Sequence, residues 1–149
     1  MIDVAMLREA LEGEVFSPDS PGYEEVRRPV NPNYGDAHPQ LVVRCRSTSD
    51  VVVAIDHARA TGMRIVPRGG GHCFAGRSTT DGIVLDMSAM NGVSVADGGL
   101  ATVEAGARLA EVYAALHAHG RTIPAGCGET VGIAGLTLGG GIGLLGRTH

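Results

Sequence analysis

Hydrophobic and polar positions follow a helical spacing at the start of the chain. This spacing continues to about Leu11, and Gly13 and Pro18 end it. Residues 17–39 (SPDSPGYEEVRRPVNPNYGDAHP) are polar and rich in proline, which removes backbone donors and restricts its neighbours. We therefore predict an N-terminal helix and an irregular lead-in segment over residues 1–38.

The next pattern predicts a strand, a helix and a second strand. Residues 41–45 (LVVRC) form a short run rich in β-branched residues. Residues 48–61 have helical spacing, with Ser47 as N-cap and Gly62 as the C-terminal stop. Residues 63–67 (MRIVP) predict the second strand. This succession is typical of a βαβ unit, so we expect parallel strands joined by a right-handed crossover.

Three further elements follow from the pattern. Residues 82–88 (GIVLDMS) predict a third strand, and residues 93–106 predict a hairpin that turns at Asp97-Gly98-Gly99. An amphipathic helix is expected over residues 108–119, ended by Gly120. After Gly120, neither the helical nor the strand periodicity of apolar residues continues. The remainder is glycine-rich and apolar without a terminating element, so we expect the front part of a longer protein.

Composition narrows the class of protein. The chain has 149 residues and is 44% hydrophobic, enough for a folded core. Twelve basic and sixteen acidic residues give a net charge of −4 without a basic run, which argues against a nucleic-acid partner. Three widely spaced cysteines favour neither a disulfide framework nor a zinc site. With no signal peptide and no run near the roughly 20 apolar residues of a membrane span, we expect a cytoplasmic protein without membrane contact.

Two glycine clusters are the candidate binding elements. The first, 69–71 with Gly76, begins where the second predicted strand ends, and ligands of open α/β sheets bind beyond such ends. The second lies in residues 126–143. Glycine lets backbone N–H groups approach a diphosphate closely, so both clusters predict a phosphate-bearing ligand.

Short nucleotide motifs explain the second cluster poorly. Residues 141–146 match GxGxxG, but no predicted helix follows and no acidic residue can lie about 20 residues further on. The same stretch is similar to a phosphate loop, with Arg147 where lysine is required.

His72 follows three consecutive glycines and has three candidate roles. It could be a structural residue at the strand end, a metal ligand, or a nucleophile that bonds to an electrophilic cofactor. The other histidines form no i, i+4 pair beside a carboxylate, so no metal site is predicted.

Two long motifs resemble a known family. Residues 67–95 (PRGGGHCFAGRSTTDGIVLDMSAMNGVSV) and 126–149 (GCGETVGIAGLTLGGGIGLLGRTH) resemble the PCMH-type FAD-binding domain of the vanillyl-alcohol oxidase superfamily, in its berberine-bridge-enzyme-like branch. The resemblance covers residues 39–149. It implies an α+β fold with a βαβ subdomain to about residue 96, then a mostly antiparallel subdomain that is incomplete.

The resemblance also implies a cofactor and its contacts. FAD would lie between the two subdomains, with the 8α-methyl of its ring bonded to His72. The implied cofactor-binding residues are Arg68, Gly69, Gly70, Gly71, His72, Gly76, Ser78, Gly126, Gly128, Thr130, Gly132, Ile133, Gly135, Leu136, Gly139, Gly140, Gly141 and Gly143. No catalytic acid or base is implied for this part of the family's fold.

The chain departs from the family at a cysteine. Many relatives bond a second cysteine to the flavin, in a Gly-x-Cys-x-x-Val-Gly pattern. Here Gly128 holds that position and Cys127 lies one residue earlier, which in an extended segment turns the side chain to the other face. We therefore expect a single link through His72, with Cys127 as a packing residue and Cys73 as a small buried side chain.

The resemblance predicts an FAD-dependent oxidoreductase. It would take a hydride from an alcohol, sugar or amine carbon, and dioxygen would reoxidise the flavin. Two alternatives remain: a non-catalytic, truncated relative that needs a partner chain or oligomer, and a phosphate-binding protein without flavin.

Overall fold

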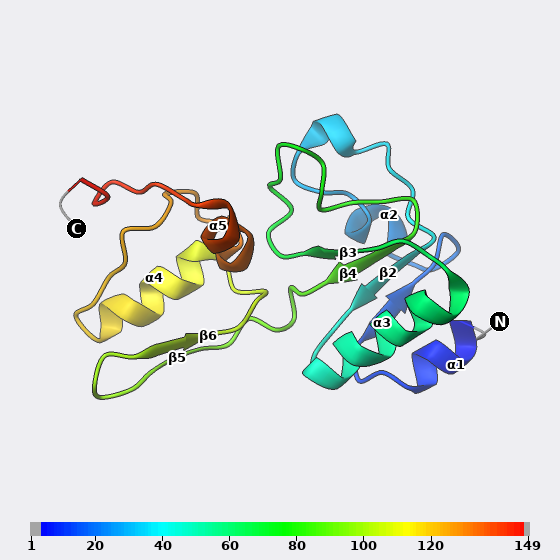
Figure 1. Cartoon of the computed structure of the whole chain (residues 1–149), viewed down its shortest axis with the longest axis horizontal. Helices are drawn as coiled ribbons and strands as arrows, with labels where there is room; N and C mark the ends of the chain where they lie inside the picture. Colours follow the sequence, from blue (N-terminus) through cyan, green and yellow to red (C-terminus); the bar gives the residue numbers. More distant parts are fainter. Residues whose placement is uncertain (1–3, 148–149) are drawn as a thin grey trace.

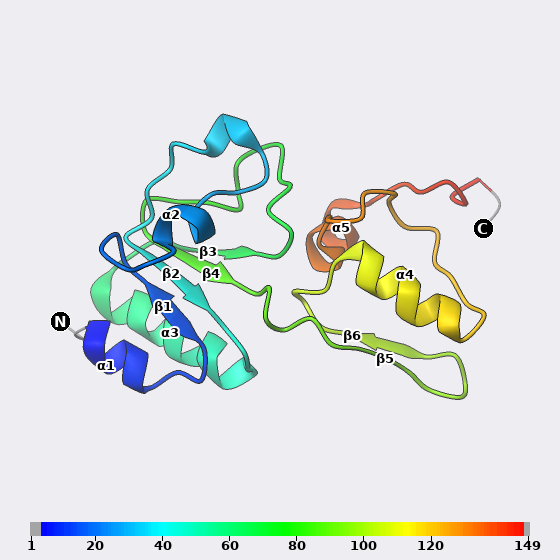
Figure 2. The ribbon, with the colours of Figure 1, turned by 180° about the vertical axis from the view of Figure 1, so that it is seen from behind.

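The computed structural model of the protein describes residues 4–147 and has two parts, which lie side by side in Figures 1 and 2. The first part contains a four-stranded sheet, and the second contains a β-hairpin and two helices. The elements of the first part are α1 (Val4–Glu9), β1 (Glu14–Phe16), α2 (Tyr23–Val26), the 3₁₀ turn η1 (Pro32–Tyr34), β2 (Leu41–Arg44), α3 (Thr48–Thr61), β3 (Ile65–Arg68) and β4 (Ile83–Asp86). Those of the second part are β5 (Val93–Val95), β6 (Ala101–Val103), α4 (Leu109–Ala118) and α5 (Ile133–Gly139).

The strand order of the first part is β1-β2-β4-β3. The predicted parallel arrangement is confirmed, since β2 and β3 both pair in parallel with β4, and β1 joins antiparallel at the edge. However, β4 lies between the two strands of the predicted βαβ unit. The register places Arg44, Asp86 and Arg68 side by side at the carboxyl ends of the three parallel strands.

Alternate residues of the central strands pack against opposite faces of the sheet. Side chains of one set contact α3 and α1 and form a core with Leu41, Val43, Ala54, Ala58, Ile83 and Leu85. The other set packs beside α2 and forms a smaller core of Tyr23, Val42, Val66 and Val84. This period of two is expected for a sheet that is covered on both faces.

The helix α3 has the predicted boundaries. Ser47 Oγ accepts a hydrogen bond from Asp50 N at 3.3 Å, and Gly62 ends the helix in the left-handed conformation at φ 69°. Asp50 is buried and its carboxylate accepts from the backbone N–H groups of Glu12 (2.9 Å) and Arg46 (2.8 Å). The N-terminal segment is thereby joined to the start of α3.

The second part confirms the predicted hairpin and helix. Strands β5 and β6 pair antiparallel, and α4 packs on them through Val112 and Leu116, with Ala107, just before the helix, in the same core. Gly99 has φ 84° in the turn between the strands, and Gly120 has φ 63° directly after His119, the C-cap of α4.

Four elements were not predicted. The strand β1 is only three residues long, and α2 and η1 lie in the lead-in segment that the prolines suggested to be irregular. The helix α5 lies inside the second glycine cluster. It was not predicted because glycine has a low intrinsic helix propensity. No helix within residues 4–147 is long and apolar enough to cross a membrane.

A buried histidine on α3 makes the stability of the fold depend on pH. His57 is 2% exposed, and neither ring nitrogen has a hydrogen-bond partner among residues 4–147. Burial lowers its pKa from the ordinary value of 6.5, so the folded protein binds its proton less readily than the unfolded chain. The neutral ring stabilises the fold above about pH 6.5, and this contribution is lost as the pH falls below the unfolded value.

We predict that His57→Leu reduces the loss of stability between about pH 7.5 and about pH 5, since it removes the group that the unfolded state protonates more readily. Urea unfolding at both pH values measures the free energy of unfolding and thus its loss between them. His117→Gln, which changes an exposed histidine, is the control for the loss of an imidazole as such. An equal loss in the wild type and in His57→Leu would contradict the prediction.

Candidate functional site

The first glycine segment leaves the sheet at the end of β3. Gly69 and Gly70 are half-buried, and neither makes a hydrogen bond within the described part of the chain. Gly71 has φ 73°, the left-handed conformation that favours glycine, and its carbonyl accepts from Val30 N at 3.2 Å. The segment therefore presents two successive peptide N–H groups that no acceptor within residues 4–147 occupies.

The two glycine segments contact each other through their backbones. A Cβ atom at Gly70 would lie 2.3 Å from Gly132 N and 2.7 Å from the carbonyl oxygen of Thr130. A Cβ atom at Gly132 would lie 2.4 Å from Gly70 N. Glycine is required at both positions because any side chain would overlap the facing backbone.

His72 is held at this junction by a side chain from the other segment. Its Nε2 lies 2.8 Å from Thr130 Oγ1, although the two residues are 58 positions apart. His72 is half-buried and Thr130 is exposed. The hydrogen bond brings together two residues that the sequence resemblance assigned to one site.

The side chain of Arg68 lies behind the first segment and supports it. It is 6% exposed and donates to the carbonyl of Arg27 at 3.0 Å and to that of Val26. Desolvation by burial lowers its pKa, although Asp86, 3.9 Å away, favours the charged form. Arg68 therefore joins β3 to the lead-in segment, a role that its position in the motif did not predict.

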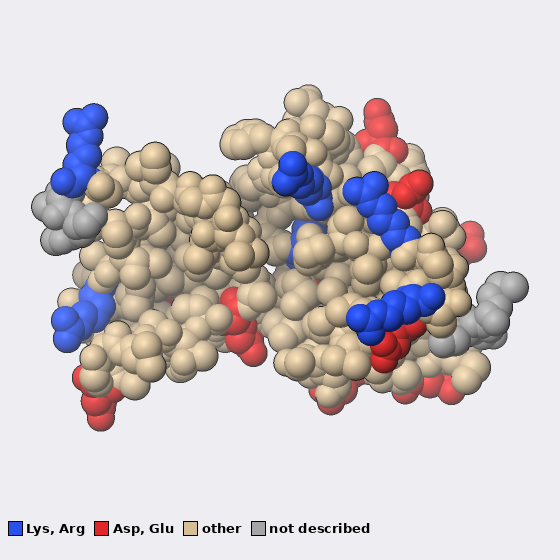
Figure 3. Space-filling model, in the orientation of Figure 1, with Lys and Arg blue, Asp and Glu red and all other residues tan. Residues whose placement is uncertain are grey.

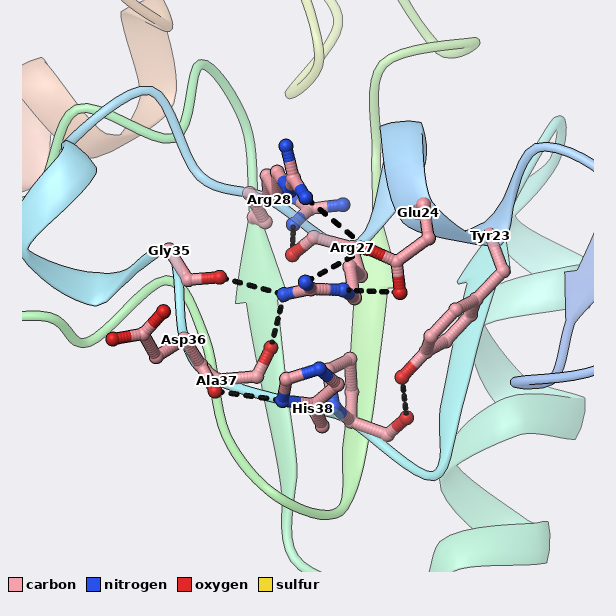
Figure 4. Close-up of polar contacts among 10 residues, drawn as sticks. Tyr23, Glu24, Arg27, Arg28, Gly35, Asp36, Ala37 and His38 are labelled. Carbon is pink, nitrogen blue, oxygen red and sulfur yellow. Dashed lines mark hydrogen bonds and ion pairs between the residues drawn. The ribbon is translucent and has the colours of Figure 1, made fainter.

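The lead-in segment is fixed by two further side chains (Figure 4). Arg27 donates to the carbonyls of Gly35 (2.6 Å) and Ala37 (2.9 Å) and forms an ion pair with Glu24 at 2.8 Å. This hydrogen bond lowers the pKa of the Glu24 carboxyl. Tyr23 donates to Pro39 O at 2.6 Å.

Tyr34 extends this support to the histidine loop. Its hydroxyl donates to Phe74 O at 3.0 Å, and its ring lies against Gly76, where a Cβ atom would approach within 2.4 Å. Gly76 has φ 68°. Ser78 follows and is buried, with no partner for its hydroxyl among residues 4–147.

The second segment packs on the start of α4 and then forms α5. Leu109 N donates to Val131 O, and Ile133 N donates to Ala107 O, both at 3.0 Å. Gly128 accepts from Val131 N at 3.1 Å. Two other predicted glycines, Gly126 and Gly141, lie beside Leu136. Gly143 lies against the backbone of Ala125. The remaining three border open space: Gly135, Gly139 and Gly140.

A cavity of about 180 Å³ lies at the carboxyl ends of the parallel strands, below the first glycine segment. Its lining includes residues 69–71 and the charged residues Glu25, Arg28, Arg44, Arg68, Asp86 and Arg108. Four arginines against two acidic residues make it positive, whereas charges of both signs are interspersed over the surface in Figure 3. The cavity therefore favours an anionic ligand.

The cysteines differ from two of the predictions. Cys127 is exposed, so it has no packing role within residues 4–147, and Cys73 is half-buried rather than buried. Cys45 is buried in the sheet, where desolvation raises its pKa to about 12. No group of histidine, cysteine and acidic residues within the described chain could hold a metal ion.

Comparison with known proteins identifies the family. Residues 39–149 match the family described as FAD binding domain. The chain belongs to this family. Over 144 residues it is 40% identical to the FAD-linked oxidoreductase YgaK of Bacillus subtilis, covering 95% of this chain and 32% of that protein. The chain thus spans about a third of the length of such relatives.

Solved structures of FAD-linked oxidases show the same fold. The 6-hydroxy-D-nicotine oxidase of Arthrobacter nicotinovorans is 32% identical, with a TM-score of 0.87 over 91% of this chain and 30% of that one. Glucooligosaccharide oxidase of Acremonium strictum, whose FAD is 6-S-cysteinyl and 8α-N1-histidyl, is 31% identical. Its TM-score is 0.88 over 98% of this chain and 31% of that one. The predicted α+β, PCMH-type fold is confirmed.

The residues of the site fit the FAD of this family. The free peptide N–H groups of Gly69 and Gly70 and the positive cavity suit a diphosphate. The buried hydroxyl of Ser78 has no partner in the described part of the chain and can bond to a polar ligand group.

Gly70→Ala should lower the free energy of unfolding by about 1–3 kcal/mol, because its Cβ atom must displace the backbone of Gly132. Thermal unfolding of the FAD-free chain measures this effect. Gly135→Ala is the matched control: its Cβ atom meets nothing within 4 Å, and alanine favours a helix over glycine by about 1 kcal/mol. Equal melting temperatures for Gly70→Ala and the wild type would refute the contact.

The thiols should differ in reactivity towards iodoacetamide at about pH 8. Cys127 is exposed and should be alkylated, whereas Cys45 is buried with a pKa of about 12 and should remain unmodified in the folded protein. Peptide mass spectrometry identifies the modified residues, and labelling in urea shows that Cys45 can react. Modification of Cys45 before unfolding would contradict its burial.

Proposed function

We propose that the protein is an FAD-dependent oxidoreductase whose flavin is bonded covalently to His72. The observation that carries this proposal is the 2.8 Å hydrogen bond between His72 Nε2 and Thr130 Oγ1, which joins the two glycine segments. An imidazole held at that junction is a nucleophile beside the diphosphate-binding backbone.

Residues of this chain would bind and orient the cofactor. Gly69 and Gly70 would donate peptide N–H groups to the diphosphate, and Ser78 would add a hydroxyl. The arginines of the cavity would offset its negative charge. When bound, FAD accepts a hydride from a substrate carbon, and dioxygen reoxidises it.

The proposed substrate is a small molecule that is oxidised at a carbon bearing oxygen or nitrogen. One similar protein acts on a glucooligosaccharide and another on 6-hydroxy-D-nicotine, which supports an alcohol, sugar or amine substrate. We assign no catalytic base in this chain. Each tyrosine hydroxyl already donates to a backbone carbonyl: Tyr23 to Pro39, Tyr34 to Phe74 and Tyr113 to Gly126.

A single covalent link is proposed, in contrast to the two links of glucooligosaccharide oxidase. Gly128 holds the position of the family's second link, and Cys127 lies one residue earlier on an exposed stretch of backbone. A glycine has no side chain that could bond to the flavin.

A second proposal is that this part of the fold functions with further polypeptide from a partner chain. Three large apolar side chains at and beyond α5 are almost fully exposed: Leu138 (90%), Ile142 (88%) and Leu144 (92%). Three exposed large apolar groups within residues 138–144 are typical of a surface that other polypeptide covers.

The covalent link is tested by expressing the natural gene in the presence of FAD and measuring the mass of the denatured protein. We expect the wild type and Cys127→Ala to keep flavin after denaturation and His72→Ala to lose all covalent flavin. Flavin that stays on His72→Ala and is lost from Cys127→Ala would assign the link to the cysteine. A wild type that binds no FAD would overturn the proposed function.

A further inference from the structure

The histidine loop, residues 72–77, has little structure of its own. It contains no helix or strand, and a single backbone hydrogen bond closes within it, from Gly76 N to Cys73 O at 3.2 Å. A loop with so few internal hydrogen bonds has many accessible conformations. The position of His72 therefore depends on contacts that other segments supply.

The lead-in segment supplies such contacts on both sides of His72. Val30 N donates to the carbonyl of Gly71 at 3.2 Å. Asn31 Nδ2 donates to the carbonyl of Cys73 at 3.5 Å. The carbonyls directly before and directly after the histidine are thus both held by the same two neighbouring residues.

Tyr34 holds the next part of the loop by two independent contacts. Its hydroxyl donates to the carbonyl of Phe74 at 3.0 Å. Its ring lies against Gly76 so closely that a Cβ atom there would overlap the ring. The ring contact limits where the loop can pass, and the hydroxyl fixes the carbonyl of the second residue after His72. A phenylalanine at position 34 would keep the first contact and remove the second.

Tyr34 is itself connected to the strand from which the loop emerges. The buried Arg27 donates to the carbonyls of Gly35 at 2.6 Å and Ala37 at 2.9 Å, directly after the turn that contains Tyr34 (Figure 4). Arg68, the last residue of β3, donates to the carbonyl of Arg27 at 3.0 Å. These contacts form a closed ring, which runs from β3 through the lead-in segment and back to the loop that follows β3. Tyr34 therefore holds the loop from a position that β3 fixes.

We propose that Tyr34 is a positioning residue, whose hydrogen bond to the carbonyl of Phe74 holds the His72 imidazole where it bonds to the flavin. This inference rests on the proposed function, since it concerns the covalent link at the same site. It adds a residue outside both glycine segments that controls how fast the link forms. The rate of bond formation depends on how often the reacting groups are correctly placed, so a more mobile loop reacts more slowly.

The bond formation balances with dioxygen as the oxidant. A ring nitrogen of His72 forms a bond to the carbon of the 8α-methyl group, and one C–H bond of that methyl group breaks. The imidazole releases its N–H proton, so the ring stays neutral. Two protons and two electrons are released in total, and they pass to dioxygen to give hydrogen peroxide. Tyr34 takes no part in these transfers and acts only on the conformation of the loop.

The test compares Tyr34→Phe with Tyr23→Phe in the protein expressed from its natural gene. Both changes remove a hydroxyl that donates to a backbone carbonyl, that of Phe74 for Tyr34 and that of Pro39 for Tyr23. The bond of Tyr23 is buried and ends at Pro39 rather than in the histidine loop, so Tyr23→Phe is the matched control for lost stability. Each protein is isolated without flavin and mixed with FAD, and the covalent flavin on the denatured protein is followed with time.

Two further measurements separate the position of the loop from cofactor binding. Affinity for non-covalent FAD is measured in a His72→Gln background, with and without Tyr34→Phe. Hydrogen exchange of the peptide that contains residues 72–77 is followed by mass spectrometry without FAD, and it reports the mobility of the loop.

We expect Tyr34→Phe to slow attachment about threefold to tenfold, the effect of one lost hydrogen bond, and to speed the exchange of the loop peptide. Tyr23→Phe should lower stability and leave the attachment rate and the loop exchange within about twofold of the wild type. Non-covalent affinity should change by less than about twofold in Tyr34→Phe. The free N–H groups of Gly69 and Gly70 precede the part of the loop that Tyr34 holds, and they stay in place.

Three results would overturn the inference alone. The first is an attachment rate or a loop exchange in Tyr34→Phe equal to that of the wild type. The second is equal slowing in Tyr34→Phe and Tyr23→Phe, which would make the effect one of stability. The third is a loss of non-covalent affinity as large as the loss of rate, which would make Tyr34 part of the FAD-binding site. A wild type that forms no covalent flavin would instead overturn the proposed link, together with the inference that depends on it.

Discussion

The contact between the backbones of Gly70 and Gly132 is the constraint on which the site depends. The two peptide segments approach so closely that neither position has room for a methyl group. Because the contact is made by backbone alone, the peptide N–H groups beside it stay free of side chains that could occupy them. The same approach brings His72 within hydrogen-bond distance of Thr130 and joins the two parts of the molecule.

Buried charges support this junction from the sheet side. Arg44, Asp86 and Arg68 lie side by side at the ends of β2, β4 and β3, and Asp86 accepts from Arg44 Nε at 3.2 Å. Burying an arginine is costly unless its donors find acceptors. Arg68 meets this requirement by donating to the carbonyls of Val26 and Arg27. These two hydrogen bonds also hold the lead-in segment against the end of β3.

Local patterns predicted the regular elements of the fold well. The cap at Ser47, the stop at Gly62 and the β-branched run of β2 are each determined by neighbouring residues, and all are found in the structure. The position of β4 between β2 and β3 depends on pairing between distant segments, which no local pattern records. The helix α5 was missed because packing of Ile133 on the second part's core stabilises a segment with a poor intrinsic preference.

The candidate site was predictable through its motifs, and its supporting contacts were not. The resemblance pointed to both glycine segments and to His72, because their spacing is characteristic of a family. The bonds from Arg27, Tyr34 and Arg68 end on backbone carbonyls, which every residue possesses. The sequence therefore does not indicate which backbone carbonyl accepts each of these hydrogen bonds.

The strand order also has a kinetic consequence. During synthesis β2, α3 and β3 are completed before β4, yet β2 and β3 have no hydrogen-bonded contact with each other in the finished sheet. Until residues 83–86 arrive, each of these strands has at least one open edge, of the kind that pairs readily with other chains. Such long-range parallel pairing is slow to form. This part of the protein is therefore most vulnerable to aggregation in the interval before β4 is inserted between β2 and β3.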